Sequence, residues 1–268
     1  GMAMVGAKQG INILINIFYN VAVNAAVGVA NQVRNAVFGF ITSFQTAFNP
    51  QIVKLYAAKD TEQLLALIYR SSKFSYYLLF IISFPILLFC KEILSIWLVN
   101  VPDYAVVFTQ LVIIASFTEA LSAPLWTAIG ATGKVQKYQI LVSLIVFLDV
   151  PLVYVAFKLG MHPTTAFVIT LIIGVLAYLY RLFYIRKFVP YHISQYIKKV
   201  VLPCCVVTVL SIPVPYILYG YGTSTINTIL LAIGTTAIST VITLFIGLDK
   251  SEKKFVKSIF NKMLKKIS

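Results

Sequence analysis

The chain has 268 residues, of which 60% are hydrophobic and only 11% charged, and its formal net charge is +14. This composition is typical of a polytopic membrane protein and excludes an ordinary soluble domain. Lys side chains on the inner face of a membrane meet anionic lipid, so the charge predicts membrane lipids as partners and no nucleic acid.

Eight apolar stretches follow one another along the sequence. Each approaches or exceeds the roughly 20 residues that a helix needs to cross a hydrocarbon core about 30 Å thick. They cover residues 2–20, 24–48, 74–90, 105–128, 139–157, 163–184, 200–219 and 226–247. We therefore predict an all-α, polytopic membrane helix bundle with eight transmembrane helices.

The positive charges predict an orientation for these helices. If the chain starts in the cytoplasm, 18 of its 22 Lys and Arg residues fall in inner segments, while only Lys91 and Lys158 fall in outer loops. The inner cations are Lys54, Lys59, Arg70, Lys73, Lys134, Lys137, Arg181, Arg186, Lys187, Lys198, Lys199 and the seven Lys from Lys250 to Lys266. Cytoplasmic loops retain Lys and Arg, so both ends are predicted to be cytoplasmic.

Two inner segments have the pattern of surface helices. Asp60 is placed as an N-cap with Gln63 three residues later, which predicts a short cytoplasmic connecting helix. From Ser251 onward, apolar and basic side chains occupy opposite faces, which predicts an interfacial amphipathic helix. The apolar face holds Phe255, Val256, Ile259, Phe260, Met263, Leu264 and Ile267, and the basic face holds Lys253, Lys254, Lys257, Lys262, Lys265 and Lys266.

Polar residues inside the predicted spans are candidates for function, because an ionisable group in hydrocarbon is costly unless it meets a partner or water. The first span carries the row Lys8, Asn12, Asn16 and Asn20 at a spacing of four residues. The second span carries Asn24, Asn31, Arg34, Asn35, Thr42, Gln45 and Asn49. Two such helices predict the wall of a hydrophilic cavity that prefers anions. The alternative is that the amides bond to one another between packed helices and that the cations pair with Glu119 or Asp149.

Glu119 and Asp149 are candidates for an ion-coupling site. Glu119 lies within a span between Ser116 and Ser122, and Asp149 lies two residues before Pro151. A proline removes one backbone N–H and frees the carbonyl one turn earlier. A carboxylate beside such a break offers the mixed oxygen ligands that Na⁺ or H⁺ sites in transporters use.

No pattern of an enzyme or of a metal site is present in the sequence. His162 and His192 lie in loops without Ser, Cys or a carboxylate at catalytic or ligand spacing. Cys90, Cys204 and Cys205 lie in or at the ends of spans and indicate neither a disulfide framework nor a metal centre. We therefore expect no catalytic residues and no cofactor apart from a coupling ion.

Three segments resemble a known family. They are "VNAAVGVANQVRNAVFGFITSFQTAFNPQIVKLYAAKD" (residues 23–60), "IYRSSKFSYYLL" (68–79) and "APLWTAIGATGKVQKYQI" (123–140). They resemble the carboxyl-terminal half of polysaccharide flippases of the MOP superfamily, which translocate O-antigen or capsule repeat units. In the resemblance the Asn49-Pro50 pair ends a span and a Gly-Lys turn joins two spans. Residues after about 200 match only in hydropathy.

The resemblance implies a fold, a function and a cellular location. Residues 1–184 would form one six-helix lobe, residues 185–247 a carboxyl-terminal pair and residues 248–268 a basic cytoplasmic tail, with another lobe absent from this chain. The function implied is translocation of an undecaprenyl-diphosphate-linked oligosaccharide across the bacterial inner membrane by alternating access, in the company of a polysaccharide polymerase. Lys8 and Arg34 would meet the diphosphate, with Asn12, Asn16, Asn31 and Asn35 beside them. The alternatives are a cation-coupled multidrug efflux transporter and a membrane glycan polymerase or acyltransferase.

Overall fold

The computed structural model describes residues 2–214 and 225–257, and all the regular secondary structure in these residues is helical. The elements are α1 (Met2–Phe18), α2 (Val21–Ala57), α3 (Thr61–Leu88), α4 (Cys90–Trp97), α5 (Ala105–Ala131), α6 (Gln136–Phe147), α7 (Asp149–Lys158), α8 (Thr164–Tyr184), η1 (Ile185–Lys187), α9 (Ile193–Tyr196), η2 (Ile197–Val201), α10 (Leu202–Ser211), α12 (Thr225–Ile242) and η4 (Thr243–Gly247). The predicted all-α class is confirmed.

Six helices within the described residues are long and apolar enough to cross a membrane. They are Thr61–Leu88, Ala105–Ala131, Gln136–Lys158, Thr164–Lys187, Ile193–Ser211 and Asn227–Gly247. The described residues thus contain the helices of a polytopic membrane protein, and the total of eight spans stays a prediction. The first two predicted spans fall on α1 and α2, which are not among the six. Helix α1 has only 17 residues, and cationic and amide side chains lower the hydropathy of α2.

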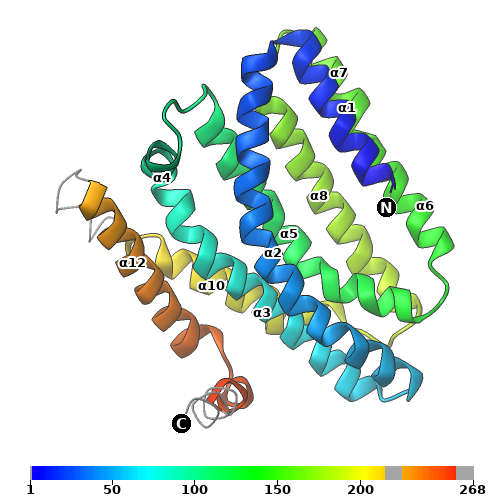
Figure 1. The fold of residues 1–268 in the computed structure, drawn as a ribbon. Helices are drawn as coiled ribbons and strands as arrows, with labels where there is room; N and C mark the ends of the chain where they lie inside the picture. Colours follow the sequence, from blue (N-terminus) through cyan, green and yellow to red (C-terminus); the bar gives the residue numbers. More distant parts are fainter. Residues whose placement is uncertain (1, 215–224, 258–268) are drawn as a thin grey trace.

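Helix α5 lies at the centre of the bundle and packs against α2, α3 and α8 (Figure 1). Helix α1 runs beside α6 and α7, where Gly10 allows close approach: a Cβ at this position would lie 2.9 Å from a methyl group of Val150. Three apolar clusters fill the bundle. One contains Phe80, Leu125, Tyr138 and Tyr196, another contains Ile15, Ala30, Phe108 and Val153, and the smallest contains Val37, Ile41, Leu79 and Ala120.

Two predicted boundaries between spans are wrong. Helix α2 does not end at Asn49-Pro50 but continues through Pro50 to Ala57. Helix α3 begins at Thr61, so the predicted connecting helix is the first part of a single 28-residue helix. Asp60 is its N-cap, as predicted, and accepts a hydrogen bond of 3.1 Å from the backbone N–H of Gln63. No Pro or Gly lies between Thr61 and Phe84, so nothing in the backbone interrupts this helix.

The span predicted at residues 139–157 is present but divided at Leu148 into α6 and α7. Pro151 follows the break and lies in the first turn of α7. In that turn a backbone N–H has no partner within the helix, so the proline costs no hydrogen bond to α7 itself. Asp149 is the first residue of α7 and lies directly after the break.

The carboxyl-terminal helices pack on α3. The span predicted at 200–219 begins earlier, at Ile193, and its last residues lie outside the described part of the chain. The Tyr76 hydroxyl lies 2.7 Å from that of Thr208, and the Tyr77 hydroxyl donates to the Gly247 carbonyl over 2.9 Å. A Cβ on Gly247 would lie 2.7 Å from the Tyr77 oxygen, so this approach requires glycine.

The basic tail begins with a helix over residues 250–257, and a capping box starts it. The Asp249 carboxylate accepts from the Glu252 N–H over 2.9 Å, and Glu252 accepts in return from the Asp249 N–H over 2.9 Å. Desolvation raises the pKa of Asp249, but hydrogen bonds from Glu252 and Ser251 and the charge of Lys73 outweigh it, and the net shift is downward. The predicted tail residues from Ile259 to Ile267 lie outside the described residues.

A buried ion pair attaches the tail helix to α3. The Lys73 ammonium lies 2.5 Å from the Glu252 carboxylate, and both side chains are only 6% exposed. Beside this pair, the Phe74 and Phe255 rings stack with their centroids 6.2 Å apart. The sequence pattern places Lys73 in an inner segment and does not reveal this contact with the tail.

Removal of the Glu252 charge should destabilise the fold. Glu252→Gln would leave Lys73 buried without a counter-charge, which typically lowers the free energy of unfolding by about 3–5 kcal/mol. Unfolding of the purified chain in detergent micelles, followed by circular dichroism, measures this loss. Glu62→Gln, at an exposed position of α3, is the control and should change stability by less than about 0.5 kcal/mol. Equal stability of the two variants would show that the pair does not anchor the tail.

Candidate functional site

Arg34 and Glu119 form an ion pair between α2 and α5. The Arg34 side chain is 19% exposed and that of Glu119 is 39% exposed, so the pair lies at the edge of the bundle and not in its centre. The Arg34 guanidinium also lies 4.9 Å from the centre of the Phe38 ring and donates to the Asn35 amide oxygen over 3.4 Å. One of the alternatives from the sequence, a pair between Arg34 and Glu119, is therefore present.

Lys8 lies close enough to this pair for its ammonium to interact electrostatically with both Arg34 and Glu119. Its side chain is exposed on α1, and it forms no ion pair in the described part of the chain. The three groups together carry one excess positive charge. The shared cavity predicted for Lys8 and Arg34 stays a prediction.

The amides divide into two groups. Asn16 and Asn35 are exposed, and Asn12 and Asn31 are partly buried; no hydrogen bond among the described residues joins these four to one another. Further along α2, Gln45 donates to the Ala120 carbonyl over 3.1 Å. Asn49 likewise accepts from Thr127 over 2.9 Å, and Asn20 caps α2. Gln45 and Asn49, in the second half of α2, thus bond to α5, whereas no hydrogen bond in the described structure joins Asn31 or Asn35 to α5.

Asp149 lies apart from this cluster, in the contact between α7 and α8. Its side chain is buried, and one carboxylate oxygen accepts from the Thr170 hydroxyl over 2.8 Å, while the other has no hydrogen-bond partner in the described structure. Thr170 was not identified from the sequence, since 21 residues separate it from Asp149. The structure therefore does not bring the two predicted coupling residues, Glu119 and Asp149, together.

The serines beside Glu119 do not bind its carboxylate. Ser116 donates to the Val112 carbonyl over 2.8 Å and Ser122 to the Glu119 carbonyl over 3.1 Å, so both bonds stay within α5. Ser122 also accepts from Arg181, whose Nε donates to the Tyr138 hydroxyl over 2.5 Å. The sequence pattern places Arg181 in an inner segment, and the structure shows its guanidinium held by hydroxyl groups between α5, α6 and α8.

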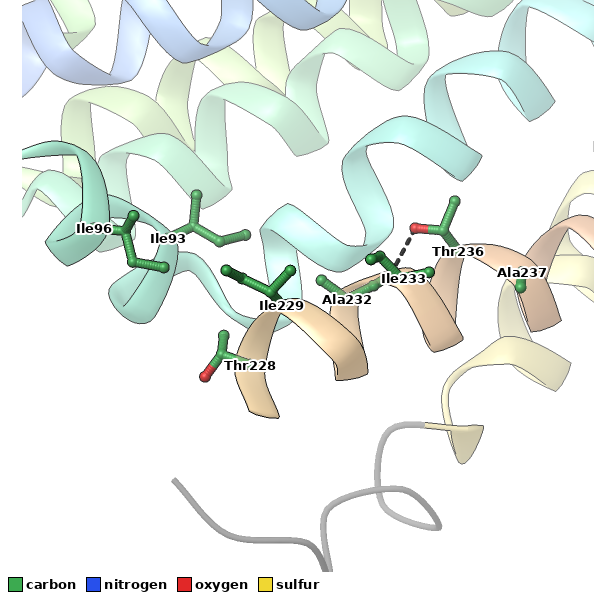
Figure 2. A pocket seen from close by; sticks show the side chains of 8 residues that line it. All are labelled: Ile93, Ile96, Thr228, Ile229, Ala232, Ile233, Thr236 and Ala237. Carbon is green, nitrogen blue, oxygen red and sulfur yellow. Dashed lines mark hydrogen bonds between the residues drawn. The ribbon is translucent and has the colours of Figure 1, made fainter. Parts of the chain in front are cut away.

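Two hollows lie away from the charged cluster. Figure 2 shows a groove of about 430 Å³ in which Ile93 and Ile96 of α4 face Ile229 and Ile233 of α12. Thr236 lies at its edge, and its hydroxyl is bonded to the Ala232 carbonyl over 2.7 Å. The second hollow, of about 610 Å³, lies between the α1–α2 junction and the segment 101–104. The apolar lining of the groove suits contact with lipid and offers little to a polar substrate.

No protein-family model, curated protein or solved structure matches the chain. Within residues 2–214 and 225–257, no three His, Cys, Asp or Glu side chains gather as the ligands of a metal ion would. The candidate site therefore comprises the Lys8, Arg34 and Glu119 cluster, and the Asp149 and Thr170 contact lies apart from it.

A double-mutant cycle should identify the partner of Arg34. Arg34→Gln and Glu119→Gln remove the two ends of one contact, so their effects on unfolding free energy should be non-additive by about 1 kcal/mol. Arg34→Gln combined with Asp149→Asn should be additive, because the two groups lie in different helix contacts. Unfolding in detergent micelles measures both cycles. A larger coupling to Asp149 than to Glu119 would contradict the observed pairing.

Proposed function

We propose that this chain is part of a translocase that moves an undecaprenyl-diphosphate-linked oligosaccharide across the bacterial inner membrane by alternating access. The single observation that carries the proposal is the cluster of Lys8, Arg34 and Glu119. It holds one excess positive charge and has the exposed Asn35 amide beside it. The resemblance of residues 23–60, 68–79 and 123–140 to MOP-superfamily polysaccharide flippases supports the same class of substrate.

The chemistry of a diphosphate fits this cluster. A diphosphate carries several negative charges and cannot enter hydrocarbon without cationic or hydrogen-bonding partners. Glu119 holds the Arg34 guanidinium in one place, and Lys8 and the remaining Arg34 donors are left to bind phosphate oxygens. Asn12, Asn16, Asn31 and Asn35 offer further donors beside them. A transporter of cationic drugs would need the opposite charge on this wall.

The same proposal assigns α1 and α2 as spans, giving eight in total, with both chain ends in the cytoplasm. These helices carry polar stripes that are too costly to expose to lipid, so in a membrane their polar faces would need water or another lobe. In this layout residues 1–184 form a six-helix lobe and residues 185–247 the pair that follows it. The distribution of Lys and Arg between inner and outer loops supports the orientation.

Loss of a cluster cation should lower translocation more than folding. Lys8→Ala removes a charge-assisted hydrogen bond worth about 1.5–3 kcal/mol, which corresponds to about a tenfold or greater fall in rate. Surface polysaccharide of cells that depend on the full-length protein measures the effect, and the amount of membrane-inserted protein reports folding. Lys91→Ala, an exposed cation outside the cluster, is the control. Unchanged polysaccharide with Lys8→Ala and Arg34→Ala would exclude the cluster as the diphosphate site.

Asp149 is the better candidate for ion coupling, because the Glu119 carboxylate is occupied by Arg34. A metal cation needs several oxygen ligands, whereas Asp149 has one hydroxyl neighbour and one open oxygen, which favours H⁺ over Na⁺. Coupling requires that the ion bind one conformation better than the other.

Replacement of Asp149 should therefore uncouple transport from the proton gradient. In membrane vesicles containing the full-length protein, Asp149→Asn should transport at a rate that no longer changes when the proton gradient is dissipated. Thr170→Val, which removes only the hydrogen bond, should keep the dependence. Transport by Asp149→Asn that still follows the proton gradient would remove Asp149 as the coupling residue, and dependence on a Na⁺ gradient in the parent protein would reject H⁺.

A further inference from the structure

The tail helix over residues 250–257 follows a candidate membrane span closely in the sequence. It begins directly after the candidate span Asn227–Gly247, and it follows the end of α12 in Figure 1. The Lys253 ammonium donates to the Phe245 carbonyl over 2.8 Å, which ties the helix to the last turn of that span. A basic segment immediately beside a transmembrane helix is placed within reach of lipid headgroups.

The buried contacts of the tail helix decide which side it presents outward. Glu252 is directed inward to Lys73, and Leu248 and Val256 pack against the core that contains α3. The helix thus uses one of its two acidic groups to neutralise a cation of α3. Asp249, the other acidic group, accepts hydrogen bonds from Ser251 and Glu252.

Five exposed cations and the partly buried Arg70 gather around this anchored helix. Lys250, Lys253, Lys254 and Lys257 are exposed on it. The Arg70 guanidinium lies 5.2 Å from the centre of the Phe255 ring, and the Lys199 ammonium lies 5.7 Å from that of Tyr69, the residue before Arg70. We define the basic surface as Arg70, Lys199, Lys250, Lys253, Lys254 and Lys257. It joins three segments that are far apart in the sequence.

We propose that the basic surface is a docking site for anionic phospholipid headgroups, held at headgroup depth by the ion pair between Lys73 and Glu252. Like charges one turn apart on a short helix repel one another, and an anionic membrane surface relieves that repulsion. Each Lys at the surface strengthens attraction to anionic lipid by about fivefold. This docking does not depend on which substrate the protein carries, so it stands apart from the proposed translocation.

Amide hydrogen exchange of residues 249–257 tests the proposal. The full chain is placed in nanodiscs of phosphatidylcholine alone and of phosphatidylcholine mixed with phosphatidylglycerol, and exchange is followed by mass spectrometry. Phosphatidylglycerol should slow exchange of this segment, because lipid that binds only the docked helix lowers the population of the undocked one. Added salt should reduce the effect by screening it.

Two sets of variants separate surface charge from folding. Lys254→Gln with Lys257→Gln removes only exposed charges and should weaken the effect of phosphatidylglycerol by about fivefold per Lys. The control removes two exposed cations elsewhere, Lys91→Gln with Lys158→Gln, and should leave the effect intact. Equal exchange of the parent chain in the two lipids, or an equal loss in both double variants, would overturn the proposal. The former outcome would direct attention to an acidic partner in the aqueous phase.

Discussion

The structure depends on one constraint, which is that a charged side chain among apolar helices needs an opposite charge, a hydrogen-bond donor or water. Lys73 meets it through Glu252, and Arg34 meets it through Glu119. Both pairs join helices that are distant in the sequence. Lys8 has no ion-pair partner of this kind in the described residues and stays exposed beside the Arg34 pair. The constraint thus separates the charges that are paired between helices from Lys8, which remains exposed.

Helix α5 shows how the fold positions these groups. Its α2-facing side presents Glu119 to Arg34 and the Ala120 carbonyl to Gln45. The residue Ser122 of the same helix accepts from Arg181 of α8. A helix with polar contacts on several sides cannot turn about its axis without breaking them. The register of α2 and α8 against α5 is therefore set by hydrogen bonds as well as by apolar packing.

The all-α class and the long apolar helices could be predicted from the sequence, because apolar runs of about 20 residues indicate helices that can cross a membrane. The ends of the helices were harder to predict, because proline does not mark them consistently. Pro50 lies within α2, whereas Pro151 lies just inside the start of α7. Periodicity placed Lys8 and Arg34 on polar faces, but it could not show that Glu119 pairs with Arg34 while Asp149 contacts Thr170. Those partners come from other helices, and the spacing of residues along one helix carries no information about them.

Cysteine labelling at the open polar face tests the central claim, that α1 and α2 present their polar residues to water and their apolar residues to lipid. In a variant without Cys90, Cys204 and Cys205, single cysteines would replace Asn16 and Asn35, or the equally exposed apolar residues Ile13 and Phe40. A water-soluble maleimide added to the membrane-embedded protein should label the first two positions and spare the last two. Equal labelling of all four, or labelling of Ile13→Cys and Phe40→Cys alone, would contradict the claim.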